Sequence, residues 1–92
     1  MKNELEVLRQ KIDKTDSMLV KILAKRMNYI PAVARYKKKH NLPRYQKSRE
    51  KEIIRKRRSQ AIENRVNPDL VEEIMKVIIK YAHKIEEGYL GR

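Results

Sequence analysis

The sequence has no cysteine, tryptophan or phenylalanine among its 92 residues. Without cysteine the chain can form neither a disulfide bond nor a thiolate metal site. Its two histidines, His40 and His83, are isolated in the sequence, so no zinc-binding cluster is expected. We expect His40 to lie in a loop and His83 to lie on the surface of a helix.

Long apolar runs are also missing, and no stretch approaches the length of a membrane-spanning helix. The N-terminus is charged and amphipathic and lacks the apolar segment of a signal peptide. We therefore expect a cytoplasmic protein that does not contact a membrane. Only 40% of the residues are apolar, so a single domain of this size has little core of its own, and sharing a core between chains is one remedy.

Positive charge is abundant: 24 lysines and arginines against 12 acidic residues make the net charge +12. Residues 42–58, LPRYQKSREKEIIRKRR, hold eight of these cations. An anionic partner is expected, but net charge alone does not distinguish a nucleic acid from a small carboxylate. The segment therefore fits either a nucleic-acid-binding arm or one wall of a pocket for a small anion.

The chain reads as three helices without a strand, which predicts an all-α fold. Apolar residues recur at spacings of three, four and seven from Leu5 to Val33, so a helix is predicted over about residues 3–39. Pro31 is expected to kink this helix without ending it. The segment HNLPRY is a predicted loop. A second, shorter helix is predicted over about residues 48–63, with Ser48 as the candidate N-cap.

The third helix has the clearest start. Asn67 is the predicted N-cap, Pro68 takes the first helical position and Asp69 lies in the first turn. The helix is predicted over about residues 68–88, and Gly88 and Gly91 are expected to end it. All three helices belong to one predicted domain, residues 1–92.

The first helix is too long for a compact domain of this size. About 37 helical residues span roughly 55 Å, whereas a compact 92-residue chain has a diameter of roughly 30 Å. Its apolar stripe would face water unless another chain covered it. The sequence therefore predicts an intertwined helical-bundle homodimer, and a coiled-coil-like oligomer is the alternative.

Charged side chains interrupt the apolar stripes of all three helices. Arg26 lies midway between Ile22 and Ile30, and Lys37 follows Val33 by four residues. The other members of this set are Arg49, Glu50 and Glu86. Any one of them could form a structural ion pair, because a buried charge must be paired or hydrogen-bonded. Five such residues together predict a polar, mostly cationic cavity inside a helical bundle.

Three segments in order resemble the all-α (AroQ-type) chorismate mutases. They are LRQKIDKTDSMLVKILAKRM, VARYKKKHNLPRYQKSREKEI and VEEIMKVIIKYAHKIEE, and together they cover nearly the whole chain. The resemblance implies that the substrate is chorismate, a small dicarboxylate, and that the chain is one chorismate mutase domain acting in phenylalanine and tyrosine biosynthesis.

The resemblance also implies residue roles. Arg26 and Arg49 would face the substrate carboxylates, since the planar guanidinium suits them. Lys37 would contact the ether oxygen, and Glu50 would accept a hydrogen bond from the ring hydroxyl. Arg9 matches an arginine that the family supplies from the other subunit. Arg9 is also roughly 25 Å from Arg26 along the same helix, too far to share a small ligand within one chain.

Four further positions would line the same site. Val33 would form part of the apolar wall. Gln46 stands where the family often has an acid, Ala82 replaces a small hydroxyl residue, and Glu86 stands where many members have glutamine. The first two departures bear on affinity more than on activity.

The implied reaction converts chorismate to prephenate in one unimolecular rearrangement that needs no metal and no cofactor. Lys37, Glu86 and Arg26 are the predicted catalytic residues, and restraint of the folded substrate would supply much of the rate. Because only a protonated carboxyl group can donate to the ether oxygen, activity is expected to fall as the pH rises and Glu86 loses its proton. Glu86→Gln should flatten that decline.

Two other functions stay open. The first is isochorismate-pyruvate lyase, which shares this fold, or a related mutase that acts on a chorismate derivative. The segment KRMNY is similar to the lyase subgroup, but Glu50 argues against a lyase because the lyases lack this glutamate. A basic nucleic-acid-binding module is less favoured. The clusters RYKKKH and RKRR could contact phosphates, yet runs of cations on helices are usually solvated, and we expect residues 55–58 at the surface.

Overall fold

The computed structural model describes residues 3–92, which form four helices and no strand. They are α1 (Glu4–Asn28), α2 (Ile30–Lys39), α3 (Lys47–Glu63) and α4 (Pro68–Leu90). The predicted all-α fold is confirmed. None of the described helices combines enough length with enough apolar character to cross a membrane.

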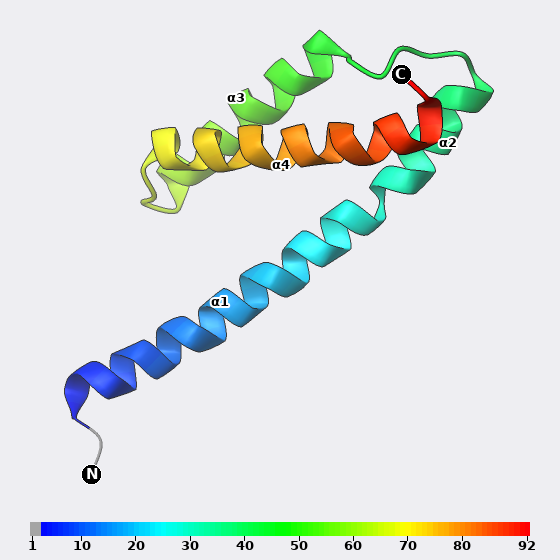
Figure 1. The fold of residues 1–92 in the computed structure, drawn as a ribbon. Coiled ribbons are helices and arrows are strands. Elements are labelled where there is room, and N and C mark those ends of the chain that lie inside the picture. The colour runs from blue at the N-terminus through cyan, green and yellow to red at the C-terminus, as the bar shows by residue number, and fades with distance from the viewer. Residues whose placement is uncertain (1–2) are drawn as a thin grey trace.

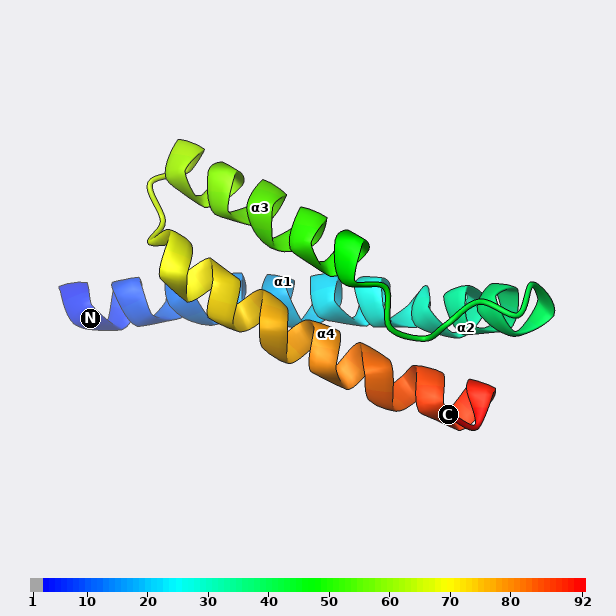
Figure 2. The same ribbon diagram turned by 90° about the horizontal axis from the view of Figure 1, so that it is seen from above.

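The helices divide into a packed part and a projecting part (Figure 1). α4 packs against α3 and α2, whereas α1 extends away from all three. The chain measures 60 × 25 × 14 Å, and its radius of gyration is 17.0 Å, against about 12 Å for a compact chain of this length. Figure 2 shows α1 and α2 running nearly in line, with α4 crossing in front of α1.

The helix predicted over residues 3–39 is present as α1 and α2, which run nearly in line and are separated only by Tyr29, so the expected interruption falls two residues before Pro31. Pro31 has no backbone N–H, so the carbonyl of Met27 cannot receive the usual helical hydrogen bond four residues on. The last turn of α1 is instead tighter than an α-helical turn, because the Tyr29 amide donates to the carbonyl of Arg26, three residues back, at 3.2 Å. α2 then starts with Pro31 in its first turn.

The second predicted helix begins one residue earlier than expected. α3 starts at Lys47, and Gln46 occupies the N-cap without a side-chain hydrogen bond to the helix. Ser48 therefore lies inside the first turn, and its prediction as the N-cap is wrong. The first turn of α3 carries Glu50, whose negative charge is favoured near the positive end of the helix dipole.

α4 has a well-defined start and end. The Asn67 side chain, at the predicted N-cap, accepts a hydrogen bond from the Asp69 amide at 2.8 Å. The helix continues through Gly88 and ends at Leu90, so the prediction that Gly88 helps to end it is wrong. Gly91 adopts a left-handed conformation with a φ of +72°, which costs glycine little, and its amide caps the Glu87 carbonyl.

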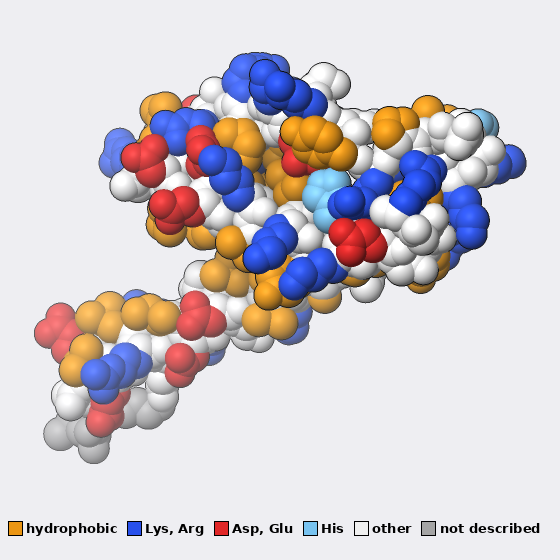
Figure 3. All heavy atoms as spheres, turned by 45° about the horizontal axis from the view of Figure 1, so that its top comes forward, with side chains coloured by type: hydrophobic (Ala, Val, Ile, Leu, Met, Phe, Trp, Pro, Cys, Tyr) orange, Lys and Arg blue, Asp and Glu red, His pale blue; other side chains and the backbone are white. Residues whose placement is uncertain are grey.

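The core of the single chain is small. Among the described residues its buried apolar members are Ala34, Ala61, Ala82 and Leu90. No residue of α1 is buried, and the apolar side chains of its stripe are exposed, for example Leu8 at 50%, Ile12 at 57% and Leu19 at 56%. Figure 3 shows hydrophobic side chains along the projecting segment. A contiguous exposed apolar stripe of this length is unusual for a chain that acts alone.

Candidate active site

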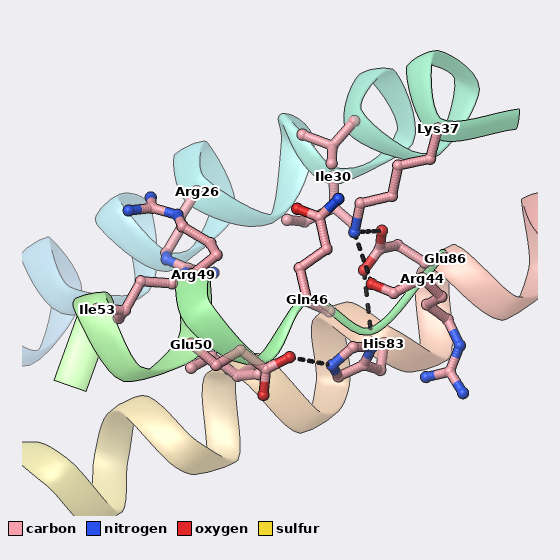
Figure 4. Close-up of a pocket in the computed structure, with 13 residues that line it drawn as sticks. Arg26, Ile30, Lys37, Arg44, Gln46, Arg49, Glu50, Ile53, His83 and Glu86 are labelled. Atoms are coloured by element: carbon pink, nitrogen blue, oxygen red, sulfur yellow. Dashed lines mark hydrogen bonds and ion pairs between the residues drawn. The ribbon is translucent and has the colours of Figure 1, made fainter. Parts of the chain in front are cut away.

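A cavity of about 170 Å³ lies where the end of α1, α2, the start of α3 and the second half of α4 meet (Figure 4). Its wall combines apolar and charged side chains. The lining residues are Arg26, Ile30, Val33, Lys37, Arg44, Gln46, Arg49, Glu50, Ile53, Ile79, Ala82, His83 and Glu86.

Eight of the nine predicted site residues line this cavity. They are Arg26, Val33, Lys37, Gln46, Arg49, Glu50, Ala82 and Glu86. Arg9, which was assigned to a second subunit, lies on the exposed part of α1 and does not line it. The single chain therefore gathers residues from all four helices and from the end of the connection between α2 and α3.

A buried ion pair joins α2 to α4 on one side of the cavity. Lys37 Nζ lies 2.7 Å from Glu86 Oε1, and the two side chains are only 12% and 6% exposed. Lys37 Nζ also donates to the Arg44 carbonyl at 2.7 Å. An ammonium group has three donors, so Lys37 keeps one N–H for a ligand. The pairing explains how two charges are tolerated in a poorly solvated place.

Two arginines lie at the other end of the cavity, next to each other in Figure 4. Arg26 Nη1 is buried and has no hydrogen-bond partner among the described residues. Burial, followed by the positive charges of Arg49 and Arg57, lowers the pKa of Arg26. Arginine stays protonated even so. A buried N–H without a partner is unfavourable, so this end of the cavity favours an anionic ligand.

Arg49 is more exposed than Arg26 and already has an acidic partner. It lies in the first turn of α3, and its guanidinium donates to the Glu52 carboxylate three residues on. Hydrogen bonding from Arg49 lowers the pKa of Glu52, with a smaller contribution from the charge of Lys56. Because Glu52 is exposed, a ligand carboxylate can compete for Arg49 at little loss.

His83 is placed differently from the prediction. It was expected on a helix surface, but its side chain is only 17% exposed and lines the cavity. His83 Nε2 lies 2.8 Å from Glu50 Oε2, and Nδ1 lies 3.7 Å from Glu86 Oε2. The helical period contained the signal, because His83 follows Ile79 by four residues and precedes Glu86 by three, and all three share one face. His40 is exposed at the end of α2, in the turn before the connection to α3.

Arg44 and three isoleucines complete the wall without having been predicted as site residues. Ile30, Ile53 and Ile79 belong to the apolar stripes, where nothing separates a cavity-lining isoleucine from one packed in a core. Arg44 comes from the connection between α2 and α3 and has no helical period to place it. Its side chain donates to the Arg92 carbonyl at 2.9 Å and lies 3.4 Å from Glu87 Oε1.

The arrangement suits a small molecule with separated negative groups. Cations stand at both ends, a carboxylate hydrogen-bond acceptor lies between them, and Val33, Ile53 and Ile79 supply apolar surface. Within residues 3–92, no cluster of three or more histidine, aspartate or glutamate side chains is placed to hold a metal ion.

Comparison with known proteins shows which family this chain is similar to. Residues 8–87 match the family described as chorismate mutase type II. A T-protein from Enterobacter agglomerans is 34% identical over 88 residues, which cover 94% of this chain and 24% of that protein. A T-protein from Haemophilus influenzae is 31% identical over 87 residues, covering 92% and 23%. The chain thus spans about a quarter of the length of the curated relatives it matches.

Proposed function

Since this chain belongs to the chorismate mutase type II family, we propose that it catalyses the rearrangement of chorismate to prephenate in phenylalanine and tyrosine biosynthesis. The observation that carries the proposal is the cavity itself, which brings eight predicted site residues together in one chain. Arg26 and Arg49 bind the two carboxylates, and Lys37 binds the ether oxygen. Glu50 accepts a hydrogen bond from the ring hydroxyl, and Val33 packs against the apolar part of the ligand.

The reaction is a single step in which the ether C–O bond breaks while a C–C bond forms, and no proton changes place. The chain therefore has two tasks. It holds the enolpyruvyl group folded over the ring, which replaces a large entropic part of the barrier. It also sets the remaining N–H of Lys37 beside the oxygen on which negative charge grows, an interaction that strengthens in the transition state.

Glu86 has a double role in this proposal. As a carboxylate it fixes Lys37 through the 2.7 Å ion pair, and as a carboxylic acid it can donate to the ether oxygen. The expected decline of activity with rising pH, and its flattening in Glu86→Gln, stay predictions. Gln46 and Ala82 contribute to the shape of the site, with no charge of their own to offer a carboxylate.

A homodimer completes the proposed site. The support is the exposed apolar stripe of α1 and the position of Arg9, which lies on that helix far from the cavity of its own chain. A second α1 packed against the first would cover the stripe and carry its Arg9 to this cavity. The oligomeric state and the cytoplasmic location expected from the sequence both stay predictions.

The test is to mix the purified chain with chorismate and to follow the loss of chorismate and the formation of prephenate. Arg26→Ala should lower kcat/KM by about a hundredfold or more, because it removes a buried carboxylate contact. Arg55→Ala is the matched control, since Arg55 is exposed on α3 and does not line the cavity. Equal activity in the two variants would contradict the proposed site.

Turnover of isochorismate distinguishes the proposed mutase from its nearest alternative, isochorismate-pyruvate lyase. Faster release of pyruvate from isochorismate than conversion of chorismate would identify a lyase, whereas Glu50 in the cavity favours the mutase. The basic segment of α3 is the basis of the second alternative, a nucleic-acid-binding module. Arg55, Lys56 and Arg57 are exposed there, and salt-sensitive RNA binding without chorismate turnover would indicate a nucleic-acid-binding module.

A further inference from the structure

One imidazole contacts the two carboxylates of the cavity. His83 Nε2 lies 2.8 Å from Glu50 Oε2 on α3, and Nδ1 lies 3.7 Å from Glu86 Oε2 on its own helix. A carboxylate only accepts hydrogen bonds, so the proton of a neutral His83 must be on Nε2, where it donates to Glu50. Nδ1 is buried and has no hydrogen-bond partner among the described residues.

Side chains from α3, from α4 and from the connection between α2 and α3 surround His83. Glu50 approaches from α3, and the Tyr45 ring lies 6.2 Å away, centroid to centroid. Glu86, which lies on the same helix as His83, is paired with Lys37 of α2. The imidazole thus stands between Glu86, whose charge is already paired with Lys37, and a second carboxylate, Glu50, to which it donates a hydrogen bond.

Glu50 lies on the boundary between the cavity and two grooves at α3 and α4. It lines one groove with Lys47, Lys51 and Lys76, and the other with Lys76, Lys80 and His83 itself. Those lysines attract a carboxylate, and the Glu50 side chain is 27% exposed and free to rotate toward them unless something holds it. The hydrogen bond from His83 opposes that rotation, because it holds Oε2 at a side chain that stands on the boundary and lines the cavity as well.

We propose that His83 is a positioning residue that keeps the Glu50 carboxylate at the cavity and away from the outer lysines. The proposal rests on the proposed function in one respect, since the ligand group that Glu50 receives is taken to be the ring hydroxyl of chorismate. His83 does not touch the reacting atoms. Its contribution therefore falls on substrate binding, and the bond-breaking step is affected little.

The contact can be tested without substrate. The chain has two histidines, so nitrogen NMR of the imidazoles gives two sets of signals, and exposed His40 serves as the internal reference. At a pH where both rings are neutral, His83 should be fixed as the Nε2–H tautomer with a proton protected from exchange. In Glu50→Ala that protection should be lost while His40 is unchanged. An Nδ1–H tautomer, or protection that survives Glu50→Ala, would overturn the proposal.

Two polar replacements separate positioning from packing. The amide nitrogen of glutamine can take the place of Nε2 and donate to Glu50. The asparagine side chain is one methylene shorter, so its amide nitrogen does not reach the Glu50 carboxylate. His83→Asn should raise the KM for chorismate about tenfold with kcat changed by less than about threefold. His83→Gln should restore most of the wild-type KM. His40→Gln is the control and should match the wild type.

A double substitution closes the test. In the Glu50→Ala background, adding His83→Asn should have no further effect on KM, because the group that His83 positions is gone. Additive effects, or equal losses in His83→Gln and His83→Asn, would show that His83 acts through packing alone. If the wild-type chain does not turn over chorismate, the proposed function fails, and the NMR comparison alone decides whether His83 holds Glu50.

Discussion

The two halves of this chain differ in how much of their structure they complete themselves. α4 packs against both α2 and α3, and these three helices form most of the wall of a cavity in which Lys37 and Glu86 are paired. α1 has no buried residue and contributes Arg26 at one end only. The same kind of apolar periodicity is satisfied within the chain in one half and left exposed in the other. Periodicity thus predicts that a face will be covered but not which chain covers it.

The largest effect is expected from breaking the self-contained half. Lys37→Ala removes the only ammonium beside the proposed ether oxygen and leaves Glu86 buried without its partner. We expect kcat to fall by about a thousandfold, and the free energy of unfolding to fall as well because an unpaired charge is buried. Steady-state kinetics and thermal unfolding measure the two losses. Lys38→Ala, exposed on the same helix, is the control.

The second prediction places a charge on the exposed apolar stripe. Leu19→Asp should convert a dimer to monomers and lower activity about a hundredfold, since the partner's Arg9 is then lost from each cavity. Sedimentation and chorismate turnover are measured on the same sample. Val20→Asp is the matched control, because its side chain is also exposed but lies about 100° around the helix. If Leu19→Asp changes neither property, α1 is not an interface.

Complementation sharpens the same comparison by using the two ends of α1. Arg9→Ala and Arg26→Ala should each be inactive alone. When they are unfolded and refolded together, roughly a quarter of the sites should become intact, because half of the dimers are mixed and each mixed dimer has one complete site. Recovered turnover measures this fraction. No recovery in a sample shown to contain mixed dimers would contradict a shared site.

The smallest effect concerns Glu72 of α4, which pairs with Lys76 on its own helix and with Arg58 of α3. Hydrogen bonding from Lys76, followed by the charges of Lys76 and Arg58, lowers the pKa of Glu72. A lowered folded-state pKa stabilises the fold above the unfolded value, and this contribution disappears as the pH falls through the folded value. Glu72→Gln should therefore lower the Tm slightly at neutral pH and not at all in strong acid. Glu73→Gln serves as the control, and a pH-independent difference in Tm would contradict the assignment.

Much of the fold and cavity followed from sequence because two signals agreed. Apolar spacing identified the helices, and charges on their apolar stripes, such as Arg26 and Glu86, marked the cavity. The interruption near Pro31 was predicted but its form was not, because a proline within a helix can be accommodated either by a bend or by interrupted hydrogen bonding, and the sequence does not choose between them.

Other parts of the site depend on contacts between distant residues. His83 was expected at the surface because nothing in the local sequence connects it to its partner Glu50, which is 33 residues away. Arg44 lies in a connection whose path no periodic pattern describes. The geometry of the predicted homodimer is still less accessible from the sequence, because an exposed apolar stripe predicts a covering helix without predicting its angle.

Because α1 is long, a small change of angle at Tyr29 would produce a large displacement at the other end of the helix. Arg9 lies 20 residues from this pivot, which is roughly 30 Å of helix, so a 10° change at the pivot would move Arg9 by about 5 Å. That displacement exceeds the tolerance of a hydrogen bond. In the proposed homodimer, the angle at this interrupted turn, which Pro31 follows and in which the Tyr29 amide bonds to the Arg26 carbonyl, would determine how far Arg9 of one subunit reaches into the cavity of the other.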